Sequence, residues 1–90
     1  MVSESELCEA ICLGVVRALR DERQRQGISM EVLAEKAGLS KGMVSLVERD
    51  LRNPTLNTIV RLSRALDMDL GRVIKSSAQA VIPKKLRKQT

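Results

Sequence analysis

The sequence predicts a compact all-α domain with five helices, and three observations support this class. The chain has 90 residues, which is enough for one compact domain and no more. Apolar residues recur at helical spacing along most of the chain, and no run alternates apolar and polar residues as a half-buried strand would. Gly27 and Gly38 stand where helices are expected to end, and Pro54 and Pro83 divide the rest.

The residue types that are missing exclude several classes of function. The chain contains no His, Phe, Tyr or Trp and only two Cys. Without His, the commonest general acid-base group is absent, and two Cys alone cannot complete a structural zinc site. Without aromatic side chains, there is no platform for stacking unpaired bases. We therefore expect no enzyme activity, no metal, no cofactor and no small-molecule ligand.

The charge favours an anionic partner without choosing one. The formal net charge is +5 and the pI about 9.8, which suits nucleic acid, an anionic surface or an acidic protein. The longest apolar run, residues 10–16, is too short to span a membrane, and the acidic residues before it do not suit a signal peptide. We expect a cytoplasmic chain with no membrane partner and with both cysteines reduced.

The first helix is expected to begin after Ser3 or Ser5 and to end at Gly27. Ser3 and Glu6 have the spacing of a capping box. The apolar stripe of this helix consists of Leu7, Ile11, Val15, Ala18 and Leu19. Residues 7–16 are apolar almost all round, which is more apolar surface than one small core requires.

Two short helices follow, joined by a tight turn. Ser29 is expected to cap the first of them and Ser40 the second. The residues expected to face the core are Val32, Leu33 and Ala37 in the first helix, and Val44 and Val47 in the second. Gly38 stands where the chain must reverse with a positive φ, and Ala34 where two helices cross closely. Two short helices in this arrangement are typical of a helix-turn-helix.

Two more helices complete the prediction. Thr55 is expected to cap a fourth helix whose apolar set is Leu56, Ile59, Val60, Leu62 and Leu66. Asp69 is expected to cap a short fifth helix that contains Leu70, Val73 and Ile74. Residues 76–90 show no clear helical stripe and end in a basic run. We therefore divide the chain into a helix-turn-helix domain at 1–75 and a C-terminal extension with a basic tail at 76–90.

Residues 19–74 resemble the Cro/repressor-type, or XRE-like, helix-turn-helix family typified by lambda repressor. The resemblance is carried by ISMEVLAEKAGLSKGMVSLVE at residues 28–48, followed by RNPTLNTIV at 52–60 and ALDMDL at 65–70. It implies a five-helix lambda repressor-like fold whose third helix enters the DNA major groove. It also implies a sequence-specific double-stranded DNA-binding regulator, a repressor or autoregulatory controller, which binds a palindromic operator as a homodimer.

The resemblance assigns site residues position by position. The base-reading positions fall on Lys41, Gly42, Ser45 and Leu46, with Met43 beside them. The phosphate-contacting candidates are Ser29, Met30, Ser40, Arg49, Arg52 and Asn53. Met30 stands where the family usually has Gln, so the hydrogen bond from that Gln to the backbone or to a base is absent. We therefore expect DNA shape to contribute more to sequence recognition. Asp50 stands where the family often has Gly, and Asp tolerates the left-handed region.

Two further expectations concern charge and exposure. The family implies an ion pair between Arg23 and Glu48; the alternative is two solvated surface charges. Because Val44 and Val47 occupy the core side of their helix, we expect Met43 and Leu46 to lie off the core and Leu46 to be exposed.

The dimer interface has two competing candidates. One consists of apolar residues of the first helix and the extension: Cys8, Leu13, Val16, Val81 and Ile82. The other consists of Leu70, Val73 and Ile74 in the fifth helix, which the family often uses.

Cys8 and Cys12 lie four positions apart on one helix, a spacing that suits a metal pair or a reactive dithiol only weakly. We favour the interpretation that they are two small apolar residues in a packed face.

An alternative function remains open. The same fold serves as an antitoxin-like or anti-regulator module, in which Met30, Met43 and Leu46 would bind a protein partner.

Overall fold

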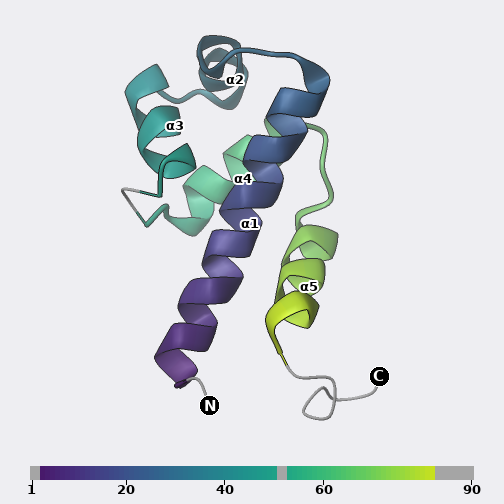
Figure 1. Ribbon diagram of the computed structural model, residues 1–90. Helices are drawn as coiled ribbons and strands as arrows, with labels where there is room; N and C mark the ends of the chain where they lie inside the picture. Colours follow the sequence, from purple (N-terminus) through teal and green to yellow (C-terminus); the bar gives the residue numbers. More distant parts are fainter. Residues whose placement is uncertain (1–2, 51–52, 83–90) are drawn as a thin grey trace.

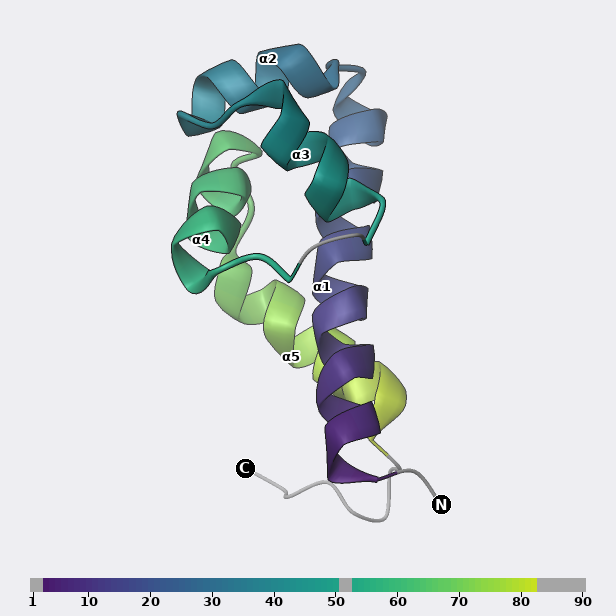
Figure 2. The same ribbon diagram turned by 90° about the vertical axis from the view of Figure 1, so that its left-hand side faces the viewer.

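The computed structural model describes residues 3–50 and 53–82, and this part of the chain contains five helices and no strand. The helices are α1 (Glu4–Gln26), α2 (Met30–Ala37), α3 (Lys41–Glu48), α4 (Leu56–Ala65) and α5 (Leu70–Val81). Helix α1 runs the length of the molecule, with α2, α3 and α4 gathered around its C-terminal half and α5 beside its N-terminal half (Figures 1 and 2). The all-α class and the number of helices agree with the prediction.

Each helix begins directly after the residue that the sequence predicts as its N-cap. The side-chain oxygens of Ser3, Ser29, Ser40, Thr55 and Asp69 each accept a hydrogen bond from a backbone N–H in the first turn. Ser3 and Glu6 form the reciprocal capping box. These caps are predictable because they depend only on residues three positions apart.

The core is aliphatic and is formed by residues from the first four helices, α1, α2, α3 and α4. Its buried residues are Val15, Val16, Leu19, Leu33, Ala34, Ala37, Val44, Val47, Ile59, Leu62 and Leu66. Three residues predicted to face inward do not: Val32 is 40% exposed, Leu56 69% and Val60 37%. They lie at the margins of apolar stripes that are wider than the arc covered by neighbouring helices, so periodicity alone could not separate them from the core.

Helix α5 is longer than predicted. The sequence shows no apolar stripe after residue 75, yet the helix continues to Val81. Its second half packs through a small residue: Ser77 is buried, and a Cβ placed on Gly14 would lie 3.1 Å from the Cβ of Ser77. Small side chains let α1 and α5 approach closely, and this kind of packing leaves no hydrophobic periodicity in the sequence.

Candidate nucleic-acid interface

Helices α2 and α3 form a tight unit around a glycine turn. Gly38 has φ +69°, as predicted, and Leu39 N–H donates to the carbonyl of Ala34 at 2.9 Å. Ala34 is buried at 3% exposure, and Leu39 packs against the core. The turn therefore has the close helix approach that a helix-turn-helix requires.

The N-termini of α2 and α3 are capped in the same way. Ser29 Oγ accepts from Val32 N–H at 3.1 Å, and Ser40 Oγ accepts from Met43 N–H at 3.0 Å. Each hydroxyl keeps its own proton available as a donor, and the first amides of each helix remain free of intrahelical partners. Both helix ends can therefore donate to an anionic oxygen.

Lys41, Gly42, Ser45 and Arg49 share the solvent side of α3, which we call its outer face. Gly42 and Arg49 are exposed and Ser45 is half-buried. The side chain of Lys41 is 61% exposed, and its Nζ lies 3.2 Å from a carboxylate oxygen of Glu31 in α2. This ion pair was not expected from the sequence, since no motif marks it.

Two hydrophobic residues of α3 are less exposed than predicted. Met43 packs against the core, although the sequence analysis placed it off the core. Leu46 is half-buried, not exposed. Met30 at the start of α2 also packs against the core. Because α3 packs against both α1 and α2, residues flanking its core stripe are partly covered as well.

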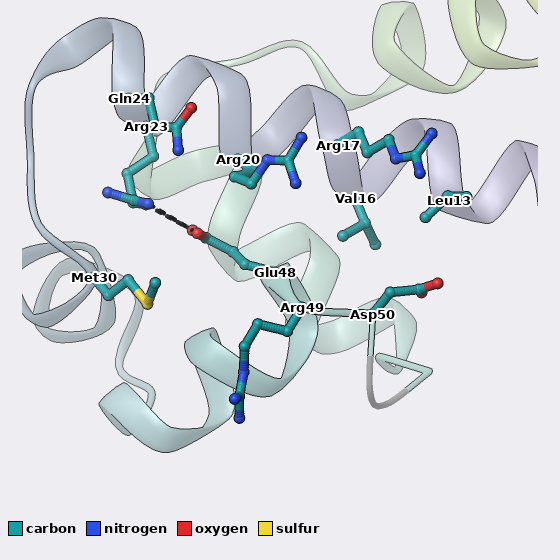
Figure 3. Close-up of a pocket in the computed structure, with 10 residues that line it drawn as sticks. All are labelled: Leu13, Val16, Arg17, Arg20, Arg23, Gln24, Met30, Glu48, Arg49 and Asp50. Carbon is teal, nitrogen blue, oxygen red and sulfur yellow. Dashed lines mark hydrogen bonds and ion pairs between the residues drawn. The ribbon is translucent and has the colours of Figure 1, made fainter.

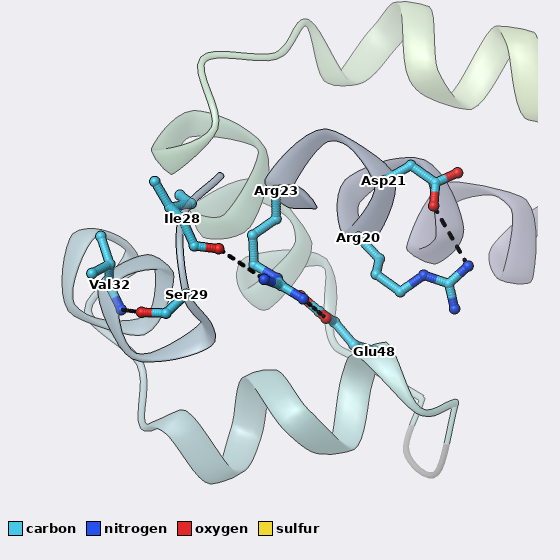
Figure 4. A network of polar contacts seen from close by, with 7 residues as sticks. All are labelled: Arg20, Asp21, Arg23, Ile28, Ser29, Val32 and Glu48. Atoms are coloured by element: carbon cyan, nitrogen blue, oxygen red, sulfur yellow. Dashed lines mark hydrogen bonds and ion pairs between the residues drawn. The ribbon is translucent and has the colours of Figure 1, made fainter. Parts of the chain in front are cut away.

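Arg23 and Glu48 form a two-point ion pair that ties α3 to α1 (Figure 4). Arg23 Nε donates to Glu48 Oε2 at 2.7 Å and its second terminal nitrogen to Oε1 at 2.9 Å. Arg23 also donates to the carbonyl of Ile28 at 2.8 Å, which joins the turn before α2 to the same group. The hydrogen bond to Glu48 raises the pKa of Arg23 above its ordinary value.

The exposed fractions of these two side chains are 11% for Arg23 and 5% for Glu48. Charges this well covered are held in place by their pairing, and removal of either one leaves the other buried alone. The pair therefore fixes the orientation of α3 relative to α1.

The chain after α3 reverses at Asp50, which has φ +58°. Asp thus adopts the left-handed conformation expected where the family often has Gly. Asn53 is exposed and lies before Pro54 and the cap of α4. Arg52, a predicted phosphate contact, lies outside the described residues.

A hollow of about 460 Å³ lies between α1 and the end of α3 (Figure 3). We call it the arginine hollow; it is lined by Leu13, Val16, Arg17, Arg20, Arg23, Gln24, Met30, Glu48, Arg49 and Asp50. Arg17 and Arg20 are not among the site residues predicted from the sequence. Their spacing with Arg23, three residues apart along α1, was the available signal that three cations share one helix face.

A second hollow, of about 930 Å³, runs along the N-terminal half of α1. We call it the apolar groove; its lining includes Cys8, Leu13, Leu56 and Ile74. The groove joins residues from both predicted dimer faces, because Cys8 and Leu13 come from α1 and Ile74 from α5. Its lining is largely apolar, with Glu6, Glu9, Asp50 and Asn53 among the polar residues, and one chain leaves this surface uncovered.

The remaining dimer candidates are less available. Val16 is 4% exposed and already belongs to the core of its own chain. Leu70 and Val73 are half-buried and pack against that core, whereas Val81 and Ile82 are half-buried at the end of α5.

The cysteines form no packed face within one chain, since Cys8 and Cys12 are both exposed. Within residues 3–50 and 53–82, no three His, Cys, Asp or Glu side chains gather as metal ligands would. No described helix is both long and apolar enough to cross a membrane.

Comparison with known proteins connects these features to a family. The helix-turn-helix family model matches residues 19–73, which contain α2, α3, α4 and the Arg23–Glu48 pair. The chain is 36% identical over 53 residues to the HTH-type transcriptional regulator SinR of Bacillus subtilis, covering 58% of this chain and 48% of that protein.

Two further relatives are also similar to part of this chain. Identity is 36% over 56 residues with the control protein C.SmaI of Serratia marcescens, covering 62% of this chain and 67% of that protein. It is 34% over 59 residues with the immunity repressor of Bacillus phage phi105, covering 66% of this chain and 39% of that protein. The chain thus spans about half the length of SinR and two thirds of C.SmaI.

Proposed function

Because the chain belongs to the helix-turn-helix family, we propose that it is a sequence-specific, double-stranded DNA-binding transcriptional regulator. The observation that supports this most strongly is the outer face of α3. Lys41, Gly42 and Arg49 are exposed there, while the ion pair between Arg23 and Glu48 fixes the helix from behind. A rigid helix with a free polar face is what insertion into a major groove requires.

The phosphate contacts are proposed to frame this helix. Ser29 and Ser40 cap the two helix ends, and Arg49 and Asn53 follow α3 as exposed polar residues. Helix N-termini and nearby cations fix a protein on the DNA backbone without reading its sequence. Base readout would then depend on Lys41 and Ser45, with only a small apolar contribution from the half-buried Leu46.

We further propose that the chain acts as a homodimer on a palindromic operator. Helix α3 has only eight residues, and one such helix reads a few base pairs, so two copies about one DNA turn apart are needed for specificity. The apolar groove supports a dimer, since Leu56 and Ile74 are 69% and 41% exposed beside it.

The alternative of a protein-binding module is less well supported. It relied on Met30, Met43 and Leu46 as an exposed apolar face. Met30 and Met43 instead pack against the core, and Leu46 is half-buried.

The test of DNA binding is selection of bound fragments from random duplexes, followed by gel retardation with Lys41→Ala. Loss of a base or phosphate contact should weaken binding by roughly tenfold or more. Lys36→Ala is the matched control, because Lys36 is exposed on the last turn of α2 and makes no ion pair among the described residues. Equal affinity of Lys41→Ala and wild type would contradict the placement of α3 in the groove.

The dimer is tested by light scattering at micromolar concentration, with and without the selected duplex. A mass of one chain under both conditions would exclude the homodimer, whereas half-sites one turn apart in the selected fragments would support it.

A further inference from the structure

The arginine hollow holds more positive charge than its own carboxylates can neutralise. Arg23 and Glu48 are committed to each other. This leaves three cations, Arg17, Arg20 and Arg49, with Asp50 as the remaining carboxylate of the lining. Arg17 and Arg49 form no ion pair within the described residues.

Arg20 is also only weakly engaged. Its nearest carboxylate is that of its neighbour Asp21, at 3.5 Å, and the two side chains are 38% and 68% exposed. An ion pair with this distance and exposure contributes little. All three guanidinium groups can therefore turn to a ligand at small cost.

The position of the hollow connects it to the outer face of α3. Arg49 is the last member of that face, eight positions after Lys41, and it also lines the hollow. Arg17 and Arg20 extend from α1 beside the end of α3 (Figure 3). A molecule that lies along the outer face of α3 thus meets the arginines of α1 at its edge.

We propose that Arg17 and Arg20, together with Arg49, bind a phosphodiester group of the DNA backbone that borders the groove occupied by α3. This inference rests on the proposed DNA binding and assigns to α1 a direct DNA contact by two residues that the sequence motif did not single out. The planar guanidinium fork matches two phosphate oxygens, and a hollow with an excess of positive charge attracts an anion.

The contact would complement a weak base-reading surface. The outer face of α3 contains no Gln or Asn and offers one Lys and one Arg. Phosphate contacts supply affinity and fix the register of the protein on the duplex. A phosphate contact from α1 would keep α3 at the position where its few base contacts can form.

The test is a salt titration of binding to the selected duplex, with full-length wild type and Arg17→Gln/Arg20→Gln. If the two arginines neutralise phosphates, the slope of log affinity against log salt should become shallower by roughly one to two units, with affinity about tenfold lower at low salt. Arg64→Gln/Arg72→Gln is the matched control, since it removes the same charge from exposed positions of α4 and α5. This control should leave the slope close to that of wild type.

A charge-preserving variant, Arg17→Lys/Arg20→Lys, should restore the slope, and circular dichroism should show unchanged folding in all variants. Equal effects of both Gln pairs, or no effect of either, would overturn the proposal while leaving DNA binding intact. Such an outcome, with a pull-down of an acidic protein that depends on Arg17, would reassign the hollow to a protein partner. Failure of wild type to retard any duplex would overturn the proposed function, and with it the proposed phosphate contact of Arg17 and Arg20.

Discussion

The two ends of α1 are held by different kinds of interaction. Around its C-terminal half, side chains bond across helices: Arg23 joins Glu48 and the carbonyl of Ile28, and Gln26 donates to the carbonyl of Leu66 at 2.8 Å. Around its N-terminal half, α5 packs by shape, with Ser77 against Gly14. Among the described residues, no side-chain hydrogen bond joins α1 to α5.

This difference separates a region whose apolar surface is covered within one chain from a region that leaves apolar surface exposed. The first region coincides with the family match; its buried ion pair joins Arg23 to Glu48, and its apolar core is covered. The second region lies mostly outside the match and leaves Ile74 and the apolar groove open. Polar bonds between helices specify one geometry, whereas an open apolar surface leaves room for a partner.

The largest effect is expected from breaking the polar region. Glu48→Ala removes the partner of an Arg23 side chain that is only 11% exposed, and should lower the free energy of unfolding by about 3 kcal/mol or more. Asp21→Ala is the control, since it removes a carboxylate from an exposed pair and should cost less than about 0.5 kcal/mol. Urea unfolding followed by circular dichroism measures both, and similar losses would mean that the buried pair does not hold this region together.

A smaller effect is expected at the packed crossing of α1 and α5. Gly14→Val places side-chain carbon where Ser77 already lies and should destabilise the fold by roughly 1–3 kcal/mol through overpacking. Ser77→Gly should relieve the clash, so the two substitutions together should cost less than the sum of each alone. A double-mutant cycle measures this coupling, and simple additivity would show that the two positions do not touch.

The smallest effect is a pH dependence within the polar region. Hydrogen bonds from Arg25 and Gln26 lower the pKa of Glu22 to about 2. Because this pKa lies below the unfolded value of about 4.3, the stabilising effect is present above that pH and is lost as the pH falls towards 2.

The titration can be followed by NMR of the Glu22 carboxyl carbon. Arg25→Ala should raise the measured pKa towards its ordinary value, because the largest cause of the shift is removed. A normal pKa for Glu22 in the wild type would show that its contacts with Arg25 and Gln26 do not persist in solution.

The sequence predicted local features well and the packing between helices less well. The five caps, the turn at Gly38 and the left-handed Asp50 depend on residues within a few positions, so their patterns are visible in the chain. Val32 and Leu56 were misplaced because their exposure depends on how wide an arc of their helices the neighbouring helices cover. The second half of α5 was missed because Ser77 packs by being small.

The candidate site was predictable to a similar degree. Its α3 positions follow from the family motif, which fixes their order along the helix. The pairing of Lys41 with Glu31 and the gathering of Arg17 with Arg49 are three-dimensional consequences that no motif contains. In a sequence, exposed cations on a helix look like ordinary solvated surface residues. Only the position of the neighbouring helix shows which other cations they face.

Helix α1 connects both regions as a single uninterrupted rod of 23 residues. At 1.5 Å per residue, its ends are roughly 34 Å apart, so a tilt of about 5° at one end displaces the other by about 3 Å. That displacement is close to the spacing of one base pair along the duplex. In the proposed dimer, a second copy seated in the apolar groove would therefore act on a lever, and small changes in the angle of α1 would shift the positions at which the two α3 helices meet the proposed operator.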